Sequence, residues 1–170
     1  MLGILALLGI IPVVSLTFAP ERDAAAIGYY EQVRLQAQSD EGARAIGGFV
    51  APEGWLWVDP YVRESFHSPD GEVTVTHQLL AAVDDPAATL RADAPAGAVA
   101  VPVVTGATSA GFATYTLEYD LAAGHEPVQL LLVCSTLTTK TDCVRLDLTG
   151  DATGAWESAI HELIESVEVI

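Results

Sequence analysis

The chain has 170 residues, 23 of them acidic and 7 basic, which gives a formal net charge of −16 at neutral pH. This balance excludes nucleic-acid binding, which needs basic patches that displace counterions from phosphates. An acidic surface keeps a protein soluble, and it can also attract a cationic protein partner or divalent ions. The Ala-rich composition, with a single lysine and no asparagine, resembles that of proteins from GC-rich actinobacteria.

The chain begins with an uncharged stretch of eighteen residues, from Leu2 to Ala19. A helix of this length spans about 27 Å, close to the roughly 30 Å hydrocarbon core of a bilayer. The stretch is longer than the apolar core of a secretory signal, and no Lys or Arg precedes Arg22. We therefore expect residues 1–20 to form a retained transmembrane anchor. An uncleaved export signal and a buried core helix are the alternatives.

Residues 21–46 are expected to form a polar helix, because small apolar side chains are mixed with charged ones and Gly47-Gly48 ends the run. The segment 21–47 is then a juxtamembrane helical stalk or a surface for partners. It carries no excess of positive charge after the apolar stretch, so it need not face the cytoplasm. Residues 48–170 would form an extracytoplasmic domain.

The domain begins with short strands. Residues 49–59 predict a strand pair, and residues 64–83 predict a hairpin whose turn is Ser68-Pro69-Asp70-Gly71. Asp85 is a candidate N-cap for a helix, with Pro86 at its first position.

Four strands are predicted next, within residues 98–106, 111–121, 127–136 and 143–150. Residues 151–169 form an amphipathic helix, whose apolar stripe runs from Trp156 to Val167. With helices segregated on a mainly antiparallel sheet, the expected fold class is α+β.

The two cysteines flank one of the predicted turns. Cys134 ends one apolar strand and Cys143 opens the next, and antiparallel neighbours at this separation can meet disulfide geometry. A disulfide is favoured over a redox or zinc site, because no C-x-x-C motif is present. It indicates an oxidising, extracytoplasmic location.

Four stretches carry a resemblance to a known family: GFVAPEGWLWVD, FHSPDGEVTVTH, DDPAATL and AWESAIHELIESVEV. In this order they resemble the PsbP-like family, as found in actinobacterial exported proteins, over roughly residues 48–168. The resemblance implies a curved antiparallel sheet covered by helices. The family's namesake is an extrinsic accessory subunit of photosystem II, and many relatives are not enzymes. No residue-level functional motif matches, so no family site residue is transferred.

The histidines are the candidates for metal binding. Strand alternation places His67 and His77 on opposite faces of their hairpin, so they should not share a metal ion, and His77 is expected to be partly buried with its hydrogen bonds satisfied. His161 lies four residues from both Glu157 and Glu165, which puts all three on one side of the last helix. This trio predicts either a solvated, salt-linked face or a weak divalent or pH-sensitive contact.

The sequence offers no catalytic motif. Ser109 lies in ATSAG, where Ala107 replaces the first glycine of a nucleophile elbow and a strand follows in place of a helix. No phosphate-binding or dinucleotide glycine loop is present. Trp55 and Trp57 share one face of their strand, which favours burial between sheet and helix, or else a ligand-binding aromatic pair.

These observations predict a non-catalytic, membrane-anchored accessory subunit without a cofactor or metal. Its partners would be integral membrane proteins contacted through the N-terminal span. The first choice of assembly is a respiratory or other electron-transfer complex that meets a cationic partner at the acidic outer face. The alternative is an extracytoplasmic module of the cell envelope that binds a small ligand. A deep apolar pocket that reaches Trp55 or Trp57 would favour this alternative.

Overall fold

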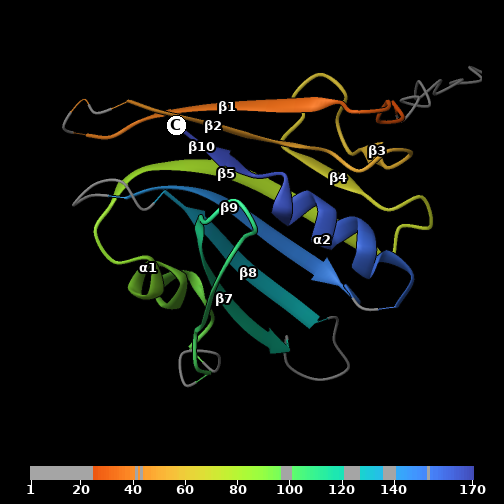
Figure 1. Ribbon diagram of the computed structural model, residues 1–170. Helices are drawn as coiled ribbons and strands as arrows, with labels where there is room; N and C mark the ends of the chain where they lie inside the picture. Colours follow the sequence, from red (N-terminus) through yellow and green to blue (C-terminus); the bar gives the residue numbers. More distant parts are fainter. Residues whose placement is uncertain are drawn as a thin grey trace, which may run out of the picture.

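The computed structural model describes residues 25–40, 42, 44–96, 101–120, 127–135, 141–152 and 154–170. About half of these residues lie in two antiparallel sheets (Figure 1). The larger sheet has the strand order β3 (Leu56–Trp57), β4 (Ser65–His67), β5 (Val73–Val83), β9 (Thr141–Gly150), β8 (Pro127–Cys134), β7 (Ala113–Asp120) and β6 (Val104–Ala107). The smaller sheet has the order β1 (Gln32–Gln38), β2 (Arg44–Val50) and β10 (Glu168–Val169).

Both faces of the larger sheet are covered. On one face, the smaller sheet and helix α2 (Glu157–Glu165) enclose the main core, which contains Phe49, Phe66 and Leu163. On the other face, helix α1 (Pro86–Asp93) buries Leu90 in a second, smaller cluster. Apolar side chains of β8 and β9 contribute to both clusters. In β8 they alternate between the two faces, so this strand contains a continuous apolar run from Leu130 to Cys134.

The expected α+β class, a single sheet covered by helices behind a transmembrane helix, is wrong. The described part of the chain is sheet-rich, and the two α-helices in it have only 8 and 9 residues. Much of the cover over the larger sheet comes from a second sheet. Among the described residues, no helix is long and apolar enough to cross a bilayer. The anchor expected at residues 1–20 lies outside the described residues.

The helix predicted for residues 21–46 is also wrong where the structure describes it, because β1 and β2 form a hairpin there. The side chains of β1 alternate, with Val33, Leu35 and Ala37 packed against the core and the polar residues between them exposed. This period of two is the signature of a half-buried strand. The neighbouring alanines, which are good helix formers, obscured it.

The Gly47-Gly48 pair does not end an element, because both residues lie inside β2. A Cβ atom at Gly48 would lie 2.4 Å from the carbonyl oxygen of Val33 on β1. The two backbones therefore approach more closely than any side chain allows.

We expect Gly48→Ala to lower the free energy of unfolding by about 2 kcal/mol, because the added methyl group forces β1 away from β2. Chemical denaturation measures the change. Gly28→Ala is the matched control, since among the described residues only a carboxylate oxygen of Glu31, at 4.0 Å, lies near its Cβ position. Equal stability of the Gly48 variant and the control would contradict a tight β1–β2 contact.

Local signals in the middle of the chain are confirmed. The β4–β5 hairpin turns at the predicted residues, where the Gly71 amide donates to the Ser68 carbonyl at 2.9 Å. Helix α1 starts at Pro86, and the Asp85 carboxylate accepts a hydrogen bond from the Ala88 amide at 3.0 Å. The last helix is shorter than predicted, because the chain leaves α2 at Ser166 and enters β10.

The two cysteines lie opposite each other on β8 and β9, as the sequence predicts. Cys134 and Cys143 form a disulfide, with their Cα atoms 4.1 Å apart. Both are fully buried in the cluster under α1. The bond therefore joins two central strands inside an apolar core.

Candidate functional site

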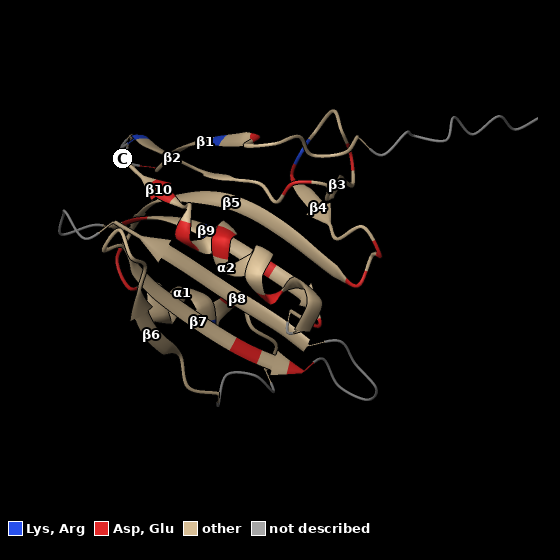
Figure 2. Cartoon of the chain, turned by 45° about the vertical axis from the view of Figure 1, so that its right-hand side comes forward, with Lys and Arg blue, Asp and Glu red and all other residues tan. Residues whose placement is uncertain are grey.

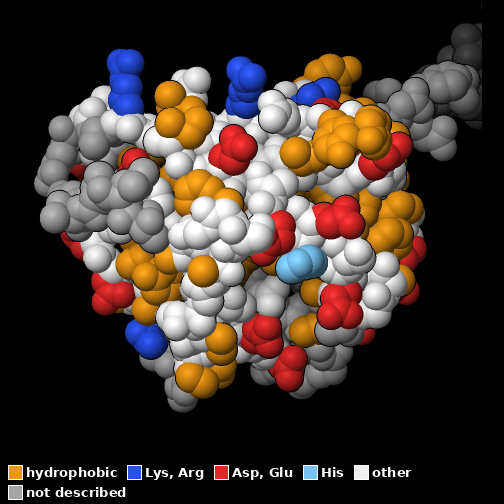
Figure 3. Space-filling model, in the orientation of Figure 1, with side chains coloured by type: hydrophobic (Ala, Val, Ile, Leu, Met, Phe, Trp, Pro, Cys, Tyr) orange, Lys and Arg blue, Asp and Glu red, His pale blue; other side chains and the backbone are white. Residues whose placement is uncertain are grey.

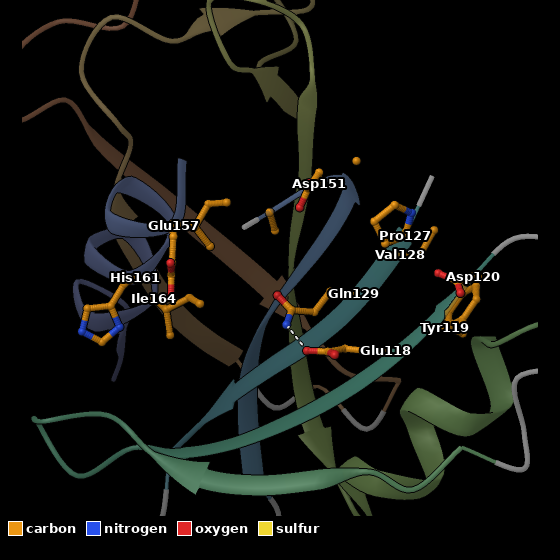
Figure 4. A pocket seen from close by; sticks show the side chains of 13 residues that line it. Glu118, Tyr119, Asp120, Pro127, Val128, Gln129, Asp151, Glu157, His161 and Ile164 are labelled. Atoms are coloured by element: carbon orange, nitrogen blue, oxygen red, sulfur yellow. Dashed lines mark hydrogen bonds between the residues drawn. The ribbon is translucent and has the colours of Figure 1, made fainter. Parts of the chain in front are cut away.

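A groove of about 560 Å³ runs between α2 and the ends of β7 and β8 (Figure 4). One wall comes from α2, the other from the two strands, and the end of β9 closes the groove. The described lining residues are Glu118, Tyr119, Asp120, Pro127, Val128, Gln129, Gly150, Asp151, Ala152, Glu157, Ile160, His161 and Ile164. We call this feature the acidic groove.

Four carboxylates face this one groove, from β7 (Glu118 and Asp120), from the residue after β9 (Asp151) and from α2 (Glu157). No Lys or Arg is present among its described lining residues. Figure 2 shows the same contrast across the molecule, with acidic residues on α2 and near the end of β7 and basic ones on β1 and β2. The described lining of the groove therefore carries an excess of negative charge.

Apolar side chains lie between the carboxylates. Ile160 and Ile164 project from α2, and Pro127 and Val128 contribute from the start of β8. On the strand side, Gln129 donates a hydrogen bond to Glu118 at 2.7 Å, which fixes that carboxylate (Figure 4). The groove thus combines negative charge with surface that can accept methylene groups.

The structure separates the predicted trio on α2. Glu157 and His161 line the acidic groove, whereas Glu165 accepts a hydrogen bond from the Ser109 amide, at 2.7 Å, in the turn between β6 and β7. This hydrogen bond lowers the pKa of the Glu165 carboxyl, and His161 contributes to the same shift. Among the residues that the structure describes, no three His, Cys, Asp or Glu side chains are placed so that they could hold one metal ion.

Trp55 and Trp57 are both buried, each 1% exposed, as expected from their shared face. Trp57 packs edge-on against Phe66, with ring centroids 5.4 Å apart, and the Arg63 guanidinium lies 5.5 Å from its ring centroid. Trp55 instead lines a second recess, on the other flank of α2. The ligand-binding alternative predicted a deep apolar pocket at Trp55 or Trp57. This recess reaches Trp55, but Glu53 and Glu162 also line it, so it is not purely apolar.

The prediction for His77 is wrong in one respect. Its side chain is buried, but neither ring nitrogen has a hydrogen-bond partner among the described residues. It packs edge-on against Phe49, with ring centroids 4.9 Å apart. Burial lowers the pKa of His77 to about 4. His77 is therefore neutral near pH 7 and is not available as a ligand at the surface.

Sequence reasoning missed the strand side of the acidic groove. Glu118 and Asp120 alternate with Tyr119, and this period of two would have placed both carboxylates on one face of β7. The sequence offers no signal that this face meets α2, because the contact joins segments about forty residues apart.

No family model matches the chain, and no curated protein matches it significantly. Among solved structures, it is similar to the crystal structure of LpqN, which is described as involved in cell envelope biogenesis of Mycobacterium tuberculosis. The two share 16% sequence identity with a TM-score of 0.39, over 85% of this chain and 82% of that chain. A likeness at this level carries no information on function. The resemblance to the PsbP-like family is not confirmed.

Proposed function

We propose that the protein is a non-catalytic, extracytoplasmic binding module that takes a small cationic ligand in the acidic groove. The observation that carries this proposal is the convergence of four carboxylates on an apolar groove whose described lining residues include no Lys or Arg. Such a groove suits a ligand that bears several ammonium groups on a methylene chain, such as a polyamine or the side chains of a lysine-rich peptide.

The electrostatics of the whole chain support the same ligand class. With a net charge of −16, the protein attracts cations at long range, and a groove lined by one sign of charge concentrates that field. The apolar residues Ile160, Ile164 and Val128 would then contact the stem of the ligand. Anionic ligands are disfavoured, because the carboxylates repel them, and purely apolar ligands gain nothing from the negative charge of the groove.

The disulfide supports the location. A bond between Cys134 and Cys143 persists in an oxidising compartment and is rare in a reducing cytosol. An extracytoplasmic site would meet cationic ligands of the medium or the cell envelope.

Membership of a membrane complex, including a respiratory one, stays a prediction from the apolar residues 2–19. Recovery of integral membrane proteins at stoichiometric yield with the full-length chain would support it. Recovery of the full-length chain alone would contradict it.

We expect spermidine to bind the full-length chain, with affinity that falls as salt is added. The double variant Glu118→Gln/Glu157→Gln should weaken binding at least tenfold, because it removes two of the four carboxylates in the groove. Calorimetric titration measures both proteins. The matched control is Glu64→Gln/Glu72→Gln, which removes the same charge from two exposed residues outside the groove. Equal weakening by both pairs would show a general field effect and contradict the site.

A further inference from the structure

A second recess of about 400 Å³ lies on the flank of α2 opposite the acidic groove. It is bounded by α2, by the turn before β1 and by the connection between β2 and β3. Four aromatic side chains line it, Tyr29, Tyr30, Trp55 and Trp156. We call this feature the aromatic recess. In Figure 3, hydrophobic side chains gather on the surface over the start of β1.

The two indoles form a fixed inner wall. Trp55 and Trp156 pack edge-to-face, with ring centroids 5.6 Å apart and an interplanar angle of 82°. Trp55 is 1% exposed, and the indole N–H of Trp156 donates to a carboxylate oxygen of Asp70 at 2.9 Å. Both rings are thus held in place without a ligand.

The two tyrosines form an exposed outer wall. Tyr29 and Tyr30 are 73% and 67% exposed, although their rings pack edge-to-face at 4.3 Å. Tyr30 has a φ of 53°, in the left-handed region that non-glycine residues rarely occupy. The turn is closed by the Gly28 amide, which donates to the Glu31 carboxylate at 3.0 Å. Two large aromatic side chains are therefore exposed to solvent at a turn in which Tyr30 has a strained backbone.

The charges at the aromatic recess have one sign. Glu53 and Glu162 are its only charged residues among those described, and no Lys or Arg lines it. Aromatic faces attract cations through the ring quadrupole, and nearby carboxylates strengthen this attraction. The fold already contains one such contact, Arg63 over the Trp57 ring.

We propose that the aromatic recess binds a soluble organic ammonium ion that carries methyl groups, with these methyl groups against the aromatic rings and with Glu53 and Glu162 supplying the counter-charge. A metal ion is disfavoured, because it would need more oxygen ligands than these two carboxylates provide. A phosphate-bearing lipid headgroup is disfavoured as well, since its phosphate would face Glu53 and Glu162. This site is separate from the acidic groove and does not depend on the function proposed for it.

Choline and 3,3-dimethyl-1-butanol test the proposal, because they have the same shape and differ in charge. The full-length chain, labelled with ¹⁵N at its tryptophans, is titrated with each compound while the indole N–H signals are followed. We expect choline to shift the Trp156 signal in a saturable way and the neutral isostere to bind at least tenfold more weakly. Phosphocholine should also bind more weakly than choline.

Variants locate the site. Glu53→Gln/Glu162→Gln should weaken choline binding about tenfold, and Tyr30→Ser should weaken it similarly, whereas the matched control Glu64→Gln/Glu72→Gln should not. The pair Glu118→Gln/Glu157→Gln, in the acidic groove, should also leave choline binding unchanged. Equal binding of choline and its isostere would overturn the proposal, as would the absence of any saturable shift or a loss of binding confined to the acidic-groove pair.

Discussion

Replacing both Cys134 and Cys143 by alanine is expected to lower the free energy of unfolding by about 2–3 kcal/mol, because the sequence separation of 9 residues closes a short loop in the unfolded chain. The two residues also lie fully buried against the cluster that holds Leu90 and Leu132. Their loss therefore loosens the contact between α1 and the larger sheet. Guanidinium denaturation of the oxidised wild type and the double variant measures the difference.

A reductant supplies the internal control for this prediction. Dithiothreitol should lower the stability of the wild type towards that of the double variant and should leave the variant itself unchanged. Because the bond is buried, the wild type is unfolded, reduced and refolded in the reductant before its stability is measured. If this treatment has no effect on the stability, the two sulfurs are not bridged, and the argument for an oxidising location fails. If the reduced wild type remains more stable than the variant, the remainder measures the packing of the two buried side chains.

Features specified by neighbouring residues were predicted from the sequence. The Asp85 cap, the Ser68–Gly71 turn and the pairing of Cys134 with Cys143 each depend on a segment of about ten residues or fewer. Local hydrogen bonds and short loops determine these structures, so the residues that specify them are neighbours in the sequence.

Features that join distant segments could not be predicted. The chain leaves β5, forms α1 and the hairpins of β6 to β9, and returns so that β9 pairs with β5. Val75 thus lies opposite Leu148, and nothing in either strand specifies that partner. Both strands are apolar on their core face, and many registers would bury the same side chains. The acidic groove depends on this pairing of β9 with β5. Only the residues on its α2 side were candidate site residues from the sequence.

The position of α2 explains why one short helix borders two cavities. Leu163 is buried in the main core, and the helix turns by about 100° at each residue. Glu157 and His161 therefore project on one side of the buried stripe, into the acidic groove, and Ala159 and Glu162 project on the other, into the aromatic recess. A change that displaces the helix should affect both sites, whereas the paired Gln variants act on one site each.

Acid is expected to destabilise the protein through His77. The pKa of His77 is about 4 in the folded protein, lowered from 6.5 by burial. As the pH falls below 6.5 the unfolded chain takes up a proton that the folded protein does not, so the free energy of unfolding decreases until about pH 4. The difference of the two pKa values corresponds to about 3 kcal/mol. Above pH 6.5, His77 should not contribute to the pH dependence of the free energy of unfolding.

His77→Leu isolates this contribution, because leucine fills a similar volume and does not titrate. Four charged residues line the cavity beside His77, namely Glu31, Arg34, Arg63 and Glu64. They are present in both proteins, so their effects on the free energy of unfolding cancel in the difference. Denaturation curves are measured between pH 7 and pH 4. Over this range the free energy of unfolding should fall by about 3 kcal/mol less in the variant than in the wild type. Parallel curves for the wild type and His77→Leu would mean that water or a movement of the chain solvates the imidazole, and that His77 is not held neutral by burial.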